Sequence, residues 1–85
     1  MTRRVEYSRE AARTLSRIDR ATSKRIRRKL EQLAADPASL ANNVAALKGR
    51  EGLMRLRVGD WRAIYTETLT VIAVQKVAPR GSAYE

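Results

Sequence analysis

Residues 54–66 read MRLRVGDWRAIYT, and this stretch decides the fold of the chain. Apolar residues alternate with arginines up to Val58, and a second β-like run begins at Trp61. Strict alternation is typical of a strand with one buried face, and a Gly-Asp pair between two such runs suits a tight hairpin turn. The stretch therefore predicts two antiparallel strands joined by the two-residue turn Gly59-Asp60.

A third strand is predicted after this hairpin. Glu67 and Thr68 begin a second tight turn, and residues 69–77 are rich in Val, Ile and Thr. Such a run is typical of a strand that is buried on both faces or nearly so. Pro79 and Gly81 end it, because proline and glycine interrupt strands. The three consecutive strands form an antiparallel meander.

The residues before the meander change from a short strand to helices. Residues 3–7 alternate and predict a first strand, which Ser8 follows as the N-cap of a helix over 9–18. Asp19 is placed to cap a second helix over about 20–35, where apolar residues recur at helical spacing.

The connector between the helices and the meander spans residues 37–52. Pro37 ends the second helix, a short helix can lie inside the connector, and glycines near its end mark a turn into the sheet. The expected order is β-α-α-β-β-β in a single α+β domain, residues 1–85. The helices form an antiparallel hairpin that covers one face of the antiparallel sheet, and the other face stays open.

Charge and composition limit the function. The chain has 85 residues, 18 Lys and Arg against 9 Asp and Glu, a net charge of +9, and no Cys or His. Cys/His metal sites, serine-histidine triads and histidine acid–base pairs are therefore excluded, and the charge suits a polyanionic partner. The absence of a signal-peptide pattern, a transmembrane run and cysteines predicts a cytoplasmic protein with no membrane partner.

Basic residues of the meander form the candidate site. Arg55 and Arg57 are two apart and project from one face, and Arg62 begins the facing strand. Arg80 follows the last strand, and Tyr84 lies four residues further. Guanidinium groups bind phosphate and stabilise a negatively charged transition state, while a tyrosine hydroxyl can transfer a proton.

Each of these residues also has an ordinary structural interpretation. Arginines that alternate with apolar residues are typical of any solvated sheet face. Trp61 and Tyr65 offer flat faces for base stacking, but such aromatic residues more often pack in a core or hairpin. Asp60 suits the turn, and Lys76 is either an edge lysine with a buried stem or a site residue.

Two segments resemble the signature of the RelE/ParE toxin superfamily. Residues 47–65 read LKGREGLMRLRVGDWRAIY, similar to the pattern L-x-G, a turn, then x-R-L-R-x-G-D-[YW]-R-x-[IV]-Y. Residues 77–84 read VAPRGSAY, similar to the terminal V-x-x-R-x-x-x-Y. The resemblance implies a RelE-like microbial RNase-type fold and a bacterial type II toxin that a cognate antitoxin neutralises.

In the RelE branch, which is favoured, the resemblance implies a ribosome-dependent mRNA endoribonuclease without metal or cofactor, whose partners are the ribosome and mRNA. In such enzymes the ribose 2′-hydroxyl attacks the neighbouring phosphate and the bond to the 5′-oxygen breaks, which gives a cyclic phosphate on one fragment and a free 5′-hydroxyl on the other. The candidate residues are Arg62, Arg80 and Tyr84 for catalysis, and Arg55, Arg57, Trp61, Lys48 and Lys76 for binding RNA or phosphate. Leu53 stands where the best-studied RelE enzymes have a lysine, and because arginine is a poor base, Tyr84 is the best candidate for proton transfer.

Two other functions remain open from the sequence. One is a ParE-like inhibitor of DNA gyrase without nuclease activity, and the other is a basic binding module with neither activity. In every case we expect an antitoxin that lays an extended or helical segment, with acidic residues, across the helices and the sheet edge.

Overall fold

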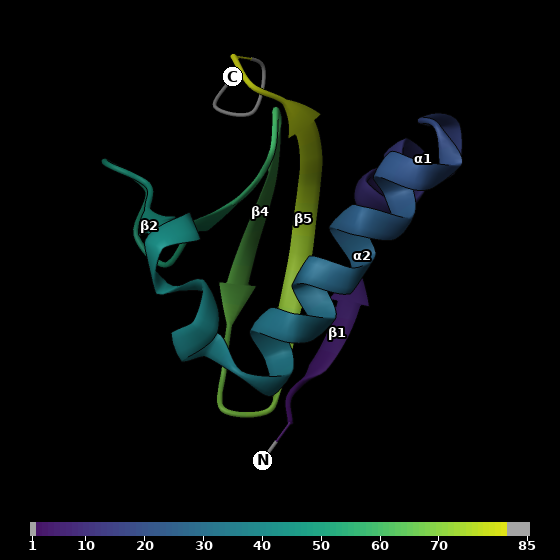
Figure 1. The fold of residues 1–85 in the computed structure, drawn as a ribbon. Coiled ribbons are helices and arrows are strands. Elements are labelled where there is room, and N and C mark those ends of the chain that lie inside the picture. The colour runs from purple at the N-terminus through teal and green to yellow at the C-terminus, as the bar shows by residue number, and fades with distance from the viewer. Residues whose placement is uncertain (1, 82–85) are drawn as a thin grey trace.

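The computed structural model describes residues 2–81, which form a five-stranded sheet in the order β1-β5-β4-β3-β2 and a layer of helices (Figure 1). The helices are α1 (Arg9–Arg17) and α2 (Arg20–Ala35), followed by a 3-10 segment (Pro37–Asn43). The strands are β1 (Arg4–Tyr7), β2 (Val44–Ala46), β3 (Met54–Val58), β4 (Trp61–Glu67) and β5 (Val71–Pro79). The predicted α+β class, the meander and the short helix in the connector are confirmed.

The strand β2 is an element that the sequence pattern did not reveal. It has three residues, Val-Ala-Ala, which is too short to show a period of two. It pairs antiparallel with β3, with Ala45 opposite Arg55. At the other edge β1 runs parallel to β5, with Val5 opposite Ile72. The predicted meander of β3, β4 and β5 is therefore the middle of a wider sheet.

The strand β5 contains a β-bulge at Gln75. Ile64 of β4 pairs with Lys76, whereas the next residue, Tyr65, pairs with Val74, so Gln75 is the extra residue. Because of this extra residue, Val74 before the bulge and Val77 after it both face the core, although they are three residues apart and a regular strand would turn them to opposite faces. This explains why the sequence of β5 looked apolar on both faces.

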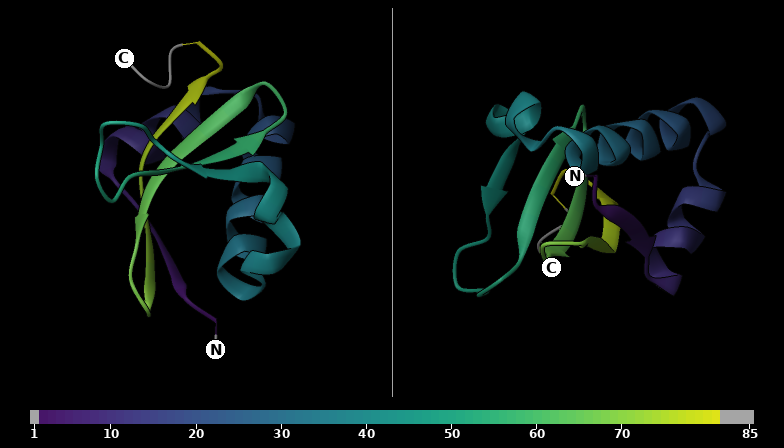
Figure 2. Two further views of the ribbon diagram at one scale, coloured as in Figure 1. Left: turned by 90° about the vertical axis from the view of Figure 1, so that its left-hand side faces the viewer. Right: turned by 90° about the horizontal axis from the view of Figure 1, so that it is seen from below.

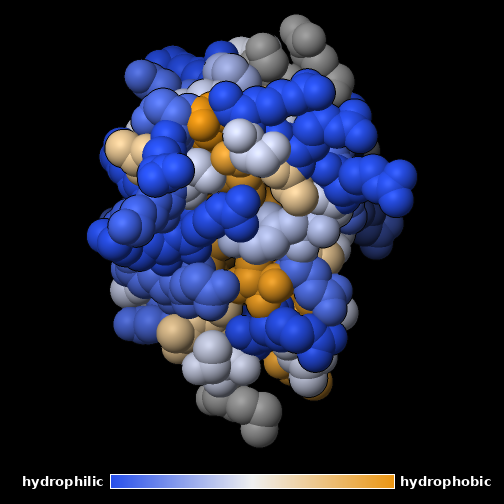
Figure 3. Space-filling view, turned by 90° about the vertical axis from the view of Figure 1, so that its right-hand side faces the viewer, coloured by the Kyte–Doolittle hydropathy of each residue, from blue (hydrophilic) through white to orange (hydrophobic). Residues whose placement is uncertain are grey.

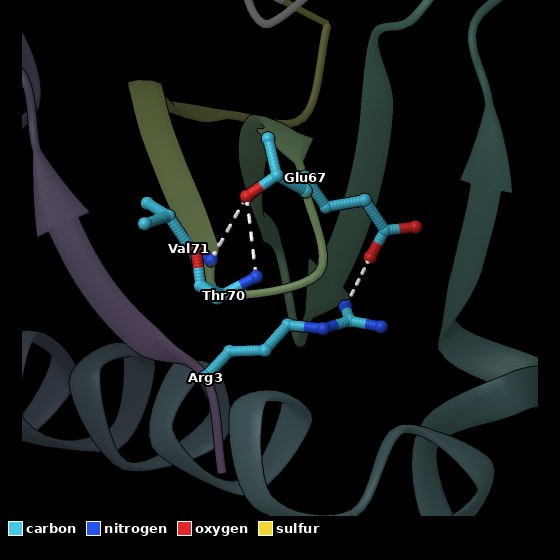
Figure 4. A network of polar contacts seen from close by, with 5 residues as sticks. Arg3, Glu67, Thr70 and Val71 are labelled. Atoms are coloured by element: carbon cyan, nitrogen blue, oxygen red, sulfur yellow. Dashed lines mark hydrogen bonds and ion pairs between the residues drawn. The ribbon is translucent and has the colours of Figure 1, made fainter. Parts of the chain in front are cut away.

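Side chains hold the turn between β4 and β5 (Figure 4). The Thr68 hydroxyl accepts hydrogen bonds from the amides of Thr70 at 3.3 Å and Val71 at 3.1 Å. Arg3, which precedes β1, reaches across to form an ion pair with Glu67 at the end of β4. Residues 69 and 70 belong to this turn. The strand β5 therefore begins at Val71, whereas the sequence pattern predicted a strand from residue 69.

Both helices begin at the predicted caps. The Ser8 hydroxyl accepts a hydrogen bond from the Ala11 amide at 3.0 Å, and the Asp19 carboxylate accepts one from the Thr22 amide at 2.9 Å. These acceptors satisfy amides that a helix leaves without partners in its first turn. The helices meet at Ile18 and diverge from this joint at an open angle, on one side of the sheet (Figure 2).

One apolar core lies between the helices and the sheet. Leu15 of α1 and Leu30 of α2 are buried against Leu56, Ile72 and other sheet residues. Burying apolar side chains in this way is the main favourable contribution to folding. Since the helices cover only this face, the opposite face of the meander is not covered by the helix layer.

Candidate functional site

The sheet face that points away from the helices carries the predicted basic residues. Arg57 of β3 lies directly opposite Arg62 of β4, and Arg55 lies opposite Ile64, which pairs on its other side with Lys76. Residues directly opposite one another in neighbouring strands share a face. The structure therefore brings the four basic residues onto one surface, which we call the open face.

The centre of the open face is apolar. Ile64 and Ala78 are each 5% exposed, and Leu47 and Leu53 pack against them. Both leucines belong to the β2–β3 connection, where the Leu47 amide bonds the Leu53 carbonyl at 3.0 Å. Leu53, at the position where the resemblance leads one to expect a lysine, is thus part of a small apolar cluster.

Arg62 is the most buried of the basic residues on this face, at 8% exposed. Its Nη1 atom donates hydrogen bonds to the carbonyl oxygens of Gly59 at 3.0 Å and Trp61 at 2.9 Å. The guanidinium is therefore turned back onto the hairpin turn. Sequence reasoning gave Arg62 a role in catalysis and did not reveal this contact, which depends on the hairpin being closed.

Arg80 is exposed just beyond the end of β5. Its amide donates a 2.7 Å hydrogen bond to the carbonyl of Asp60, which lies in the turn as the sequence predicted. Arg80 therefore lies beside the same hairpin turn that Arg62 contacts. Tyr84, the predicted proton-transfer residue, lies outside the described residues.

The two aromatic residues predicted as stacking faces lie on the other side of the sheet. Tyr65 is 1% exposed within the main core, and Trp61 is half-buried and packs against the same core. Burial raises the pKa of Tyr65 to about 12, with Glu67 adding to the effect. Both rings therefore pack in the core, as the structural interpretation expected, and neither is beside the arginines, because alternation in β4 turns residues 61 and 65 towards the helices.

The two predicted lysines differ in their surroundings. Lys48 is exposed in the turn that follows Leu47, so its position is set by the apolar cluster next to it. Lys76 is half-buried in β5, beside the bulge and opposite Ile64. Lys76 thus belongs to the open face by its strand register, whereas Lys48 is an exposed loop residue next to Leu47 of the apolar cluster.

The part of the open face that the meander forms is basic, and Glu6 of β1, on the same face of the sheet, is paired with Arg4. Within the described residues 2–81, the members of β3, β4 and β5 that share this face include no Asp or Glu. Such a surface attracts phosphate, and guanidinium groups can bind it bidentately. Within the same residues no three acidic, Cys or His side chains gather as metal ligands.

A second basic surface lies over the helices. A hollow of about 570 Å³ between them is lined by Leu15, Ser16, Ile18, Arg20, Ser23, Lys24 and Arg27. Figure 3 shows this side as largely hydrophilic with a narrow apolar strip. We call the hollow the helix groove. The sequence pattern does not reveal the groove, because it exists only where the two helices meet.

Arg27 at the helix groove is held by an aromatic ring. Its guanidinium carbon lies 5.2 Å from the ring centroid of Tyr7 in β1, a cation–π contact. Burial raises the pKa of Tyr7, and the positive charge of Arg27 opposes this rise. The contact therefore connects the groove to the edge strand of the sheet.

None of the helices within residues 2–81 is long and apolar enough to cross a membrane.

Known proteins resemble the chain over nearly its whole length. The family model for the ParE toxin of the type II toxin-antitoxin system parDE matches residues 5–84. A chain of the archaeal RelE-RelB complex from Pyrococcus horikoshii OT3 is 31% identical with a TM-score of 0.78, and the match covers 98% of this chain and 100% of that one.

Two more distant structures share the fold. A chain of the RelBE2 toxin-antitoxin complex from Mycobacterium tuberculosis is 20% identical, with a TM-score of 0.77 and coverage of 94% of this chain and 100% of that one. A mutant of the E. coli toxin RelE in the free state is 17% identical, with a TM-score of 0.76 and coverage of 99% and 88%. No curated protein sequence matches the chain.

Proposed function

The chain belongs to the RelE/ParE superfamily of type II toxins, and we propose that it inhibits translation as a ribosome-dependent mRNA endoribonuclease that needs no metal ion. The observation that carries this proposal is the open face, where cations from three strands meet without an acidic residue among the described members of those strands. The 31% identity to a chain of a RelE-RelB complex supports the same branch.

The chemistry follows from what these side chains can do. Attack by a ribose 2′-hydroxyl on the neighbouring phosphate places extra negative charge on the phosphate oxygens in the transition state. Arg57 and Arg80, both exposed, are suited to bind that phosphate and stabilise the charge. Arginine keeps its proton too firmly to act as a base, so proton transfer is assigned to Tyr84.

Primer extension on a translated reporter mRNA, with and without ribosomes, tests the activity. We expect cuts within codons that appear only when ribosomes translate the message. Changing Arg80→Ala together with Tyr84→Phe should abolish both the cuts and growth arrest, because it removes a phosphate ligand and the proton donor. Circular dichroism checks that this variant still folds.

The control is Arg28→Ala, an exposed arginine of α2, in the helix layer that covers the opposite face of the sheet from Arg57. This variant should cut RNA at close to the normal rate, because it loses the same charge away from the open face. A fully toxic Arg80→Ala/Tyr84→Phe variant would show that the proposed site is wrong.

A ParE-like inhibitor of DNA gyrase is the second candidate. It is favoured by the family model, which describes a ParE toxin, and by Leu53, which is apolar where a RelE enzyme would have a lysine. Intact mRNA in arrested cells, together with loss of gyrase supercoiling activity in vitro, would support this alternative. The open face would then bind a protein or DNA rather than cleave RNA.

The proposed partner in either case is a cognate antitoxin. The archaeal and mycobacterial structures similar to this chain are toxin-antitoxin complexes. The helix groove offers the half-buried Ile18 for apolar contact, above the buried Leu15, and cations for acidic residues: Arg20, Lys24 and Arg27. These features suit a partner segment that combines apolar anchors with carboxylates.

A further inference from the structure

Three successive carbonyl groups in the β3–β4 turn are held by two arginines. The carbonyls of Gly59 and Trp61 accept hydrogen bonds from Nη1 of Arg62, at 3.0 and 2.9 Å. Between them, the carbonyl of Asp60 accepts a 2.7 Å bond from the amide of Arg80. One turn therefore connects the side chain of Arg62 to the main chain of Arg80.

The turn has a demanding backbone conformation. Gly59 has φ +60°, whereas Asp60 does not have a positive φ, which is the pattern of a type II′ hairpin turn. On the helix side, a Cβ atom at Gly59 would lie 3.2 Å from Nη1 and 3.3 Å from Nη2 of Arg25. The turn thus packs against the side chain of Arg25 of α2 on one side, and on the other side it accepts hydrogen bonds from Arg62.

Charge explains why Arg62 folds back. Arg62 lies directly opposite Arg57, and like charges at such a position repel each other. The turn carbonyls carry partial negative charge and give the guanidinium of Arg62 acceptors away from Arg57. Because Arg62 is only 8% exposed and its Nη1 atom bonds two carbonyls, it offers a phosphate less of its guanidinium than the exposed Arg57 does.

We propose that Arg62 is a positioning residue, which fixes the Gly59-Asp60 turn and, through the Asp60 carbonyl, the main chain of Arg80 at the edge of the open face. This assigns Arg62 a role different from the phosphate-binding role of its exposed neighbours. What Arg80 binds rests on the proposed function, whereas the coupling from Arg62 to Arg80 is a property of the folded chain.

Amide hydrogen exchange of the full chain, measured by NMR, tests the coupling without RNA. In Arg62→Gln the protection of the Arg80 amide should fall about tenfold or more, because the shorter amide cannot hold both carbonyls. Arg62→Lys should keep most of the protection, since its ammonium group still donates to carbonyl oxygens. The matched control, Arg57→Gln, removes the opposite guanidinium and should change Arg80 protection less than about twofold.

Unchanged protection at Arg80 in Arg62→Gln would overturn the proposal. If that variant does not fold, the wild-type protein gives the answer. Its guanidinium ¹⁵N signals can be followed while inorganic phosphate is added. We expect the signals of Arg57 and Arg80 to shift and those of Arg62 to stay in place. A shift of Arg62 as large as that of Arg80 would show that Arg62 binds phosphate directly.

A double-mutant cycle on RNA cleavage separates positioning from direct contact. If Arg62 acts through Arg80, adding Arg62→Gln to Arg80→Ala should lower the cleavage rate by less than about twofold. If each arginine contacts phosphate independently, the two losses multiply, and the proposal fails. A wild-type chain that cuts no RNA would refute the proposed function, while the hydrogen exchange result would still decide the role of Arg62.

Discussion

Arg57 and Arg62 have the same side chain and lie opposite one another, yet their surroundings differ. Arg57 is exposed, whereas Arg62 is buried and bonded to the carbonyls of Gly59 and Trp61. The family resemblance implies RNA or phosphate binding for Arg57 and catalysis for Arg62. One residue separates each arginine from the Gly59-Asp60 turn, so the hydrogen bonds of Arg62 to the turn, and not its distance along the chain, distinguish the two.

Asp19 gives a prediction about pH at the same scale. Its hydrogen bonds with Thr22 hold the pKa of the carboxyl group below its ordinary value. A lowered pKa in the folded state stabilises the protein above the unfolded pKa, and this stabilisation is lost as the pH falls through the folded pKa. Asp19→Ala should therefore lower the melting temperature at neutral pH, and the difference from wild type should shrink below about pH 4.

Asp19→Asn is the control, because asparagine caps a helix about as well as aspartate but does not titrate. It should remain close to wild type at neutral pH and lose the acid dependence that belongs to this site. Thermal melts followed by circular dichroism at several pH values measure both variants. A destabilisation by Asp19→Ala that is equal at all pH values would contradict the prediction.

At the scale of elements, the bulge in β5 connects the start of α1 to the sheet. The Ser8 hydroxyl, which caps α1, also donates a 2.7 Å hydrogen bond to the carbonyl of Gln75, the bulged residue. The bulge also keeps Lys76 opposite Ile64 on the open face while Val74 stays in the core. A local irregularity in one strand therefore sets which residues reach the site.

Deletion of Gln75 should be tolerated. Removing the extra residue leaves Ile64 opposite Lys76 and Tyr65 opposite Val74 in a regular ladder, so the buried set does not change face. We expect a loss in unfolding free energy of about 1 kcal/mol, comparable with the Ser8 hydrogen bond. Urea unfolding measures it.

Deletion of Ala73 is the matched control, because it removes a residue from the regular part of the same strand. It should prevent folding, since a shift of one residue turns every side chain beyond it to the opposite face. Equal damage from both deletions would show that the bulge is not a separable feature.

At the scale of the whole molecule, two basic surfaces lie on opposite sides of the sheet. The open face carries cations from the meander, and the helix groove carries cations from α2. With 18 basic and 9 acidic residues, the molecule has a field that attracts anionic partners from a distance. The groove adds apolar surface that charge alone would not provide.

Binding of the proposed antitoxin should therefore depend on salt mainly through its association rate. We expect the association rate to fall steeply as NaCl increases, while the dissociation rate changes little, because short-range apolar contacts keep the complex together. Surface plasmon resonance measures both rates, and calorimetry should give a negative heat-capacity change. An antitoxin that binds only at low salt without a heat-capacity change would contradict this geometry.

The sequence by itself determined the features that depend on neighbouring residues. The alternation around Gly59-Asp60 gave the hairpin, Ser8 and Asp19 gave the helix starts, and the motif from 47 to 65 gave the family. These features can be predicted from the sequence because turn chemistry, helix capping and the strand period each depend on only a few neighbouring residues.

Only the tertiary structure decided which of these residues meet. The edge strand β2, the bulge at Gln75, the turning of Trp61 towards the core and the bonds from Arg62 to the hairpin turn all depend on strands pairing across the sheet. The helix groove likewise depends on how two helices pack. These contacts form between residues that are distant in the sequence. A local sequence pattern does not show how close such residues lie in the folded chain.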